Sequence, residues 1–294
     1  MNTIQNSTTN NNQSHKLGLK ISMAFFISLI GVILINVFAY ETQHWEISTS
    51  VNHLLRGVLF SALVIAGIWY VRRQTNALDQ PLGYKSPATA IKTLALGLGL
   101  ILVPLIITLS ATQLFGWAQI RINSNASILS SFMLGIFATF LTDALPEEVI
   151  FRGFIYSQLN TRFHKLKSSL LSVAAFVLFP LVIVAVQKML NYPIYIGGND
   201  HISPSFMITM VFFGSFMQYL RVLTNSVWTS IGFHTLFVFM NMLIGTTDSS
   251  FIQMSELTSE RPAQILLICL VVLTFASLIA YPFLTKKPIQ WKSR

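Results

Sequence analysis

Residues 128–153 read ILSSFMLGIFATFLTDALPEEVIFRG, an apolar run that ends in two adjacent glutamates and an arginine. Its apolar part approaches the length of about 20 residues that a helix needs to cross a membrane. Charged residues make up only 10% of the chain. Glu147, Glu148 and Arg152 are therefore either a polar turn at a membrane exit or ionisable groups carried into the membrane for a function.

The composition of the whole chain indicates a membrane protein. Hydrophobic residues occupy 53% of its 294 positions, and ordinary soluble domains carry about 25% charged residues. We expect an all-α fold, a polytopic membrane helix bundle with about eight transmembrane helices and both termini cytoplasmic. The expected spans lie at roughly 19–39, 53–71, 91–112, 128–145, 169–188, 206–222, 226–245 and 263–284.

The chain divides into three parts by composition. Residues 1–18 form a polar tail rich in Asn, Ser and Thr, which we expect to be disordered. Residues 19–285 form a single transmembrane helical domain, and residues 286–294 form a basic cytoplasmic tail. The single cysteine, Cys269, excludes an internal disulfide.

The basic residues set the expected orientation. With the N-terminus inside, all but four of the 19 Lys and Arg residues fall on the inner side. The net charge of +9 is then explained by topology and by anionic lipid headgroups, so we expect membrane lipids as partners and no nucleic acid. The pattern fits a plasma (inner) membrane in a prokaryote and an endoplasmic reticulum membrane in a eukaryote equally well.

Two pairs of polar residues share helical faces in the quoted stretch. Asp143 lies four residues before Glu147, and Glu148 lies four residues before Arg152, the favourable order for an ion pair. Pro146 lacks a backbone N–H, so we expect a helix that ends near Leu145 and restarts with Pro146 in its first turn.

A histidine in a later apolar segment is the second candidate. His234 lies in the middle of the expected span 226–245, and Asn241 follows it by two helical turns on nearly the same face. A lone histidine on an apolar helix is more often a packing residue than a metal ligand, so both roles stay open for His234.

The motif 147-EEVIFR-152, followed by His234 in an apolar helix, resembles the CPBP family. This family contains the CAAX prenyl endopeptidases and the bacteriocin-processing or immunity proteins, also called Abi. The segment 213-FGSFMQYLRVLTNSVWTSIGFH-234 is similar to the family's stretch before its histidine. The resemblance covers about residues 128–245. It implies an intramembrane endopeptidase that cuts a prenylated or membrane-anchored peptide or protein near the membrane surface.

The resemblance also implies roles for the residues that match its motifs. Glu147 would activate a water, Glu148 and Arg152 would support it, and His234 would be a metal ligand or an oxyanion-side group. The implied metal is zinc, with Glu147 and His234 as its ligands.

The chain departs from the family at two motif positions. Pro180, in 176-FVLFP-180, stands where the family has a histidine, and Val238 stands where it has an asparagine. A catalytic zinc usually takes three protein ligands and a water, so this ligand set is incomplete. Gln187 and Asn241 are spaced to face the same cavity, but neither is a good substitute for an imidazole ligand.

Three hypotheses follow. The first is an active protease of this family with an altered site, in which a buried carboxylate serves as general base without a full metal shell. The second is a non-catalytic pseudoprotease that binds another membrane component in immunity or regulation. The third is a small-solute transporter with Asp143 and the glutamates as a proton relay, although paired broken helices are missing from the sequence.

Overall fold

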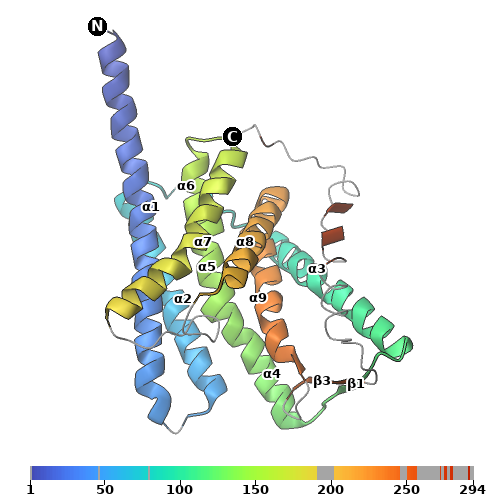
Figure 1. Cartoon of the computed structure of the whole chain (residues 1–294). Coiled ribbons are helices and arrows are strands. Elements are labelled where there is room, and N and C mark those ends of the chain that lie inside the picture. Colours follow the sequence, from blue (N-terminus) through green and yellow to red (C-terminus); the bar gives the residue numbers. More distant parts are fainter. Residues whose placement is uncertain are drawn as a thin grey trace.

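The computed structural model describes a helical bundle and a small sheet (Figure 1). It covers residues 2–45, 47–78, 80–190, 202–245 and 250–256, with isolated positions at 272, 275, 276, 279, 280 and 291. The long helices are α1 (Asn2–Glu41), α2 (Thr49–Gln74), α3 (Pro87–Leu114), α7 (Lys165–Met189), α8 (Pro204–Thr224) and α9 (Val227–Leu243). A short 3-10 turn, Thr42–His44, follows α1.

One further helical run lies between α3 and α7 and is made of five segments. They are α4 (Ala126–Thr139), a π-helical segment (Phe140–Ala144), α5 (Leu145–Glu148), a second π-helical segment (Val149–Ile155) and α6 (Tyr156–Asn160). Together they form one candidate membrane span, Ser127–Asn160. The expected span 128–145 is therefore extended by about four turns, and it carries the quoted motif inside it.

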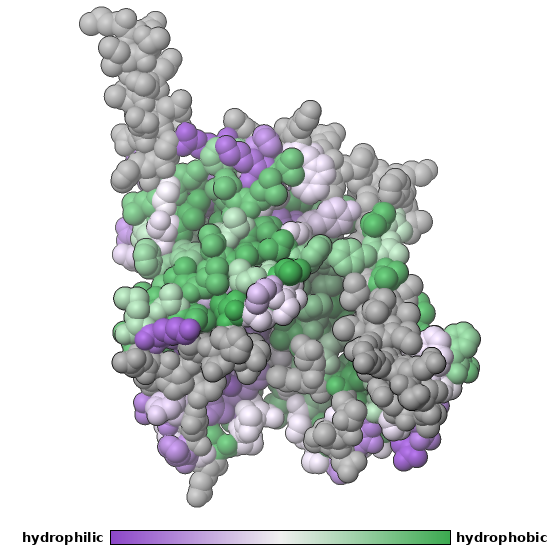
Figure 2. All heavy atoms as spheres, in the orientation of Figure 1, coloured by the Kyte–Doolittle hydropathy of each residue, from purple (hydrophilic) through white to green (hydrophobic). Residues whose placement is uncertain are grey.

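The prediction of an all-α membrane bundle is confirmed. In the described part of the chain, six helices are long and apolar enough to cross a membrane, and Val227–Met240 is a shorter apolar helix. Figure 2 shows hydrophobic side chains across the middle of the molecule, with hydrophilic ones gathered above and below. The expected span 263–284 lies largely outside the described residues, and the cytoplasmic location of the termini stays a prediction.

The disorder expected for the polar residues 1–18 stays a prediction. Helix α1 begins at Asn2, so its backbone includes residues 2–18. A helix is costly to nucleate but cheap to extend. The apolar span Lys16–Glu41 supplies the nucleus from which the polar turns continue.

A tight turn joins α8 and α9, which correspond to the expected spans 206–222 and 226–245. Asn225, in the left-handed conformation (φ 50°), ends α8, and the Ser226 hydroxyl accepts a hydrogen bond from the Trp228 N–H at the start of α9. An asparagine tolerates this conformation and a serine is a preferred N-cap. Val227 N–H donates to the carbonyl of Gly83 in the loop between α2 and α3, which ties the hairpin to that loop.

A three-stranded sheet, absent from the sequence-based expectation, joins the ends of α3, α4 and α9. Its strands are β1 (Ala118–Ile122), β2 (Ile244–Gly245) and β3 (Ile252–Glu256), in the order β1-β3-β2. β3 pairs antiparallel with β1 and parallel with β2. These strands are short, and β1 lies more than a hundred residues before β2 and β3, so local periodicity gives little sign of the pairing.

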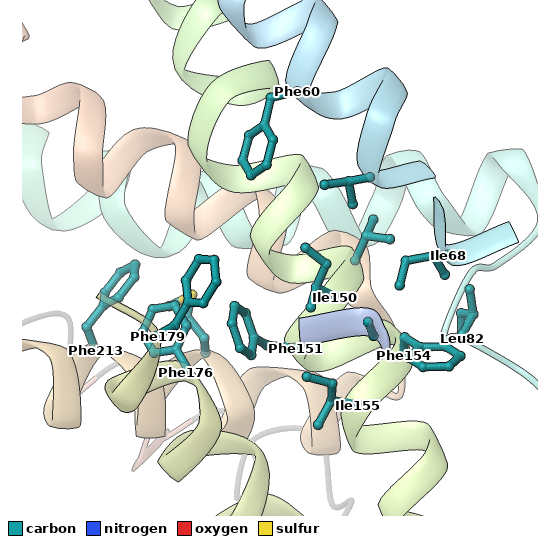
Figure 3. Packing of buried hydrophobic residues seen from close by; sticks show 14 of the residues in the cluster. Phe60, Ile68, Leu82, Ile150, Phe151, Phe154, Ile155, Phe176, Phe179 and Phe213 are labelled. Atoms are coloured by element: carbon teal, nitrogen blue, oxygen red, sulfur yellow. The ribbon is translucent and has the colours of Figure 1, made fainter. Parts of the chain in front are cut away.

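The hydrophobic core surrounds the second π-helical segment. Phe151 makes edge contacts with Phe176 and Phe179 of α7 at ring-centroid distances of 5.3 and 5.4 Å. Figure 3 shows this group of rings beside Ile150, with Phe213 of α8 at its edge. The apolar faces of the run, α7 and α8 thus meet at the motif.

Helices α3 and α9 approach each other through two glycines. A Cβ added to Gly97 would lie 2.1 Å from the Thr229 carbonyl oxygen, and one added to Gly232 would lie 2.5 Å from the Leu94 carbonyl oxygen. Both obstacles are backbone atoms, so a side chain at either position forces the helices apart.

We expect Gly97→Ala or Gly232→Ala to lower the free energy of unfolding by about 1–3 kcal/mol, because each overpacks this contact. Thermal unfolding in detergent measures the loss. Gly99→Ala on α3 is the matched control, since nothing lies within 4 Å of its added Cβ. An equal loss in all three variants would contradict the assignment to helix contact.

Candidate active site

The expected break near Leu145 is wrong, because the helical run Ser127–Asn160 is continuous. The expected position of Pro146 in the first turn of a helical segment is confirmed, since α5 begins at Leu145. The run continues through Pro146, with the five-residue π spacing immediately before it: Leu145 N–H donates to the Phe140 carbonyl. A proline removes one helical hydrogen bond and crowds the preceding turn, and a wider turn accommodates both effects. The Leu141 carbonyl, which cannot bond to Pro146, accepts a hydrogen bond from the Ser61 hydroxyl of α2 instead.

Glu148 is the centre of a buried polar cluster. Its side chain is 0% exposed, and its Oε1 atom lies 3.1 Å from Arg152 Nη1 and 3.0 Å from His234 Nδ1. An ionised carboxylate only accepts hydrogen bonds, so Nδ1 of His234 donates to it. The sequence prediction that these three residues act together is consistent with this geometry, in which α9 brings His234 onto the motif.

Glu147 lies on the other side of the same imidazole. Its Oε2 atom is 3.9 Å from His234 Nε2, and its side chain is 26% exposed, in contrast to the closed environment of Glu148. The two neighbouring glutamates therefore differ in exposure and in the nitrogen of His234 that each one meets. Glu148 orients His234 from within the protein, and Glu147 faces His234 Nε2 from a more accessible position.

Arg152 and His234 are fixed by contacts from α7 and α8. Arg152 Nη2 donates to the Gly214 carbonyl at 3.1 Å, and its guanidinium lies 4.1 Å from the centroid of the Phe176 ring. The Phe213 ring packs edge-on against the His234 ring at 4.8 Å. A buried arginine with an ion pair, a carbonyl and an aromatic face is well compensated for its desolvation.

The remaining sequence candidates have different places. Asp143 lies half-buried in the first π segment and interacts electrostatically with His234 and with Arg56 of α2. Pro180 and Gln187 are buried in α7. Val238 is half-buried in α9. Asn241 belongs to α9, but its side chain lies outside those the structure describes.

The residues present do not complete a zinc site. Among the described residues, no group of three or more His, Cys, Asp or Glu side chains could hold a metal ion. Glu147 and His234 supply two donors where a catalytic zinc usually takes three. Nδ1 of His234 is already bonded to Glu148, the partner that commonly orients a ligating histidine.

Sequence reasoning missed two residues of α8 that bind the motif. Gly214 accepts from the Arg152 side chain, and the Nε atom of Arg221 donates to the Arg152 carbonyl at 3.1 Å. From the sequence, Arg221 is one of the Lys and Arg residues expected on the inner side, which predicts no contact with the motif. Its spacing of two helical turns from Gly214 was the available signal, because that spacing places both on one face of α8.

Fold and site together define a multi-pass helical membrane protein with a buried Glu–Arg–His cluster between its helices. Residues 128–240 match the family model described as Type II CAAX prenyl endopeptidase Rce1-like, which confirms the resemblance read from the motifs. The match begins in α4 and ends in α9, so it contains every residue of the cluster. No curated protein and no solved structure matches the chain.

Proposed function

We propose that this protein is a CAAX-type intramembrane endopeptidase in which Glu147 and His234 activate a water. The observation that carries the proposal is the chain of contacts from Arg152 through Glu148 to His234 Nδ1, which leaves His234 Nε2 facing Glu147. A carboxylate that orients one nitrogen of an imidazole while the other meets the reacting groups is a recurrent catalytic arrangement. The family match supports a peptide bond as the substrate bond.

The proposed reaction uses these groups and a water. Glu147 takes a proton from the water as its oxygen attacks the scissile carbonyl carbon. His234, as an imidazolium with a proton on each nitrogen, donates Nε2–H to the carbonyl oxygen as charge develops on it. The carbon–nitrogen bond then breaks, and the amine leaves with the proton returned from Glu147. Arg152 Nη1 donates to the same Glu148 oxygen that accepts from His234 Nδ1, and so holds this acceptor in place.

The depth of the site supports a membrane-anchored substrate. About 18 Å of helix separates Glu148 from the end of the run at Asn160, at 1.5 Å per residue. About 10 Å separates His234 from the start of α9 at Val227. A scissile bond must therefore enter the helix bundle, which suits a chain already held at the membrane by a lipid group.

We expect purified protein in liposomes to cleave a farnesylated CAAX peptide, and His234→Gln to lower kcat/KM by about 10²-fold. The substitution removes the Nε2 group beside Glu147 while the side chain keeps a similar volume. Release of the C-terminal tripeptide, followed by mass spectrometry, measures it. His44→Gln, on an exposed histidine of the 3-10 turn, is the control. Equal cleavage by wild type and His234→Gln would contradict the proposed role.

The alternative, a non-catalytic relative that binds a membrane partner, makes the opposite prediction. It requires that wild-type protein leaves every prenylated peptide intact, although the cluster is folded. The zinc content of the same samples tests whether Glu147 and His234 are the only zinc ligands, because a set of two ligands predicts no stoichiometric zinc. Zinc that is bound one-to-one and lost in His234→Gln would show that a further ligand exists.

A further inference from the structure

The second π-helical segment ends at a carbonyl that the helix itself does not satisfy. Tyr156 N–H donates five residues back, to the Phe151 carbonyl, and four-residue bonding resumes in α6. When five-residue spacing returns to four, one carbonyl is passed over. Here it is the carbonyl of Arg152, which follows Phe151.

Arg221 of α8 supplies the missing donor. Its Nε atom donates to the Arg152 carbonyl at 3.1 Å, and its Nη1 atom donates to the Asn225 side chain at 3.0 Å. The guanidinium also lies 5.3 Å from the centroid of the Tyr156 ring. Arg221 itself is only 4% exposed, so water does not readily replace it.

The loop between α2 and α3 completes the setting of Arg221. Gly83 has a positive φ of 85°, and a Cβ added there would lie 2.6 Å from the Arg221 guanidinium. The absence of a side chain at Gly83 thus leaves room for Arg221 against the backbone. The loop, the α8–α9 turn and α6 all meet at this one side chain.

We infer that Arg221 is a positioning residue for the proposed reaction: it fixes the wide turn that holds Arg152 on Glu148, and thereby the orientation of His234. Helix α8 binds Arg152 twice, by its side chain through Gly214 and by its backbone through Arg221. Loss of the backbone contact lets the turn relax toward four-residue spacing, which rotates Arg152 and moves the cluster. This inference rests on the proposed function for its kinetic readout.

The test compares Arg221→Met, Arg221→Lys and Ser172→Ala. The Ser172 hydroxyl donates to the neighbouring Phe151 carbonyl, which keeps its own helical donor, Tyr156 N–H. We expect Arg221→Met to lower kcat by up to about 10²-fold with little change in KM, the scale of loss for a displaced catalytic group. Arg221→Lys recovers part of kcat because an ammonium can still donate to the carbonyl, and Ser172→Ala has a smaller effect.

Arg73→Met is the matched control for loss of an arginine. Arg73 is exposed on α2, and its guanidinium lies 5.4 Å from the centroid of the Trp69 ring on the same helix. All rates are normalised to the amount of folded protein from size-exclusion chromatography. An unchanged kcat in Arg221→Met, or a loss fully explained by less folded protein, would overturn the inference.

A spectroscopic arm separates this inference from the proposed function. In protein labelled with ¹⁵N-histidine, the His234 signal is assigned from His234→Gln, and we expect Arg221→Met to shift it while Arg73→Met does not. Wild-type protein that cleaves nothing would overturn the proposed function, and a shifted signal would still support the positioning role. An unshifted signal in folded Arg221→Met would overturn the positioning role whatever the activity.

Discussion

Glu147→Gln is expected to reduce peptide cleavage by about 10³-fold while leaving folding intact. The substitution keeps the size of the side chain but removes the carboxylate that accepts the proton from water. Glu147 is 26% exposed and 3.9 Å from His234 Nε2, so an amide there disturbs no close buried ion pair. Single-turnover cleavage of a farnesylated CAAX peptide in liposomes measures the rate of the chemical step.

A control variant and a measurement of folding accompany the Glu147→Gln experiment. Glu41→Gln, at an exposed glutamate that ends α1, controls for loss of a carboxylate as such. Unfolding temperature and detergent solubility of Glu147→Gln should match those of wild type within error. Cleavage that persists in Glu147→Gln at the wild-type rate would remove Glu147 from the chemistry and, with it, the proposed mechanism.

Glu148→Ala is expected to act on stability before activity, with a loss of about 3–5 kcal/mol in the free energy of unfolding. The substitution leaves Arg152 buried, 1% exposed, without its carboxylate, and His234 without the acceptor for Nδ1. Marginal proteins often fail to accumulate after losses of this size. Abundance in the membrane and unfolding temperature in detergent report the loss.

The double variant Glu148→Ala/Arg152→Met separates pairing from packing. Removing both partners of a buried ion pair is commonly far less harmful than removing one, so we expect part of the lost stability to return while cleavage stays absent. Glu148→Ala protein that is as abundant and as stable as wild type would contradict the view of this pair as a stabilising element. A loss of cleavage alone in Glu147→Gln and a loss of stability in Glu148→Ala would show that Glu147 serves the chemistry and Glu148 the structure.

The membrane class and the identity of the cluster could be predicted from the sequence because both rest on local patterns. Apolar runs of sufficient length mark the spans, and 147-EEVIFR-152 places Glu148 and Arg152 one helical turn apart. The same local reasoning failed at Pro146, where it predicts a break. There the hydroxyl of Ser61, far away in the sequence, satisfies the carbonyl that Pro146 leaves without a partner.

The sequence by itself determined that this chain is a membrane helix bundle and that Glu147, Glu148, Arg152 and His234 are its chemical candidates. Only the tertiary structure decided which glutamate meets which nitrogen of His234, and that α8 binds Arg152 through Gly214 and Arg221. The physical reason is that hydrophobicity and helical spacing are read along the chain. Hydrogen bonds to a widened helix turn depend instead on donors that other helices bring to it.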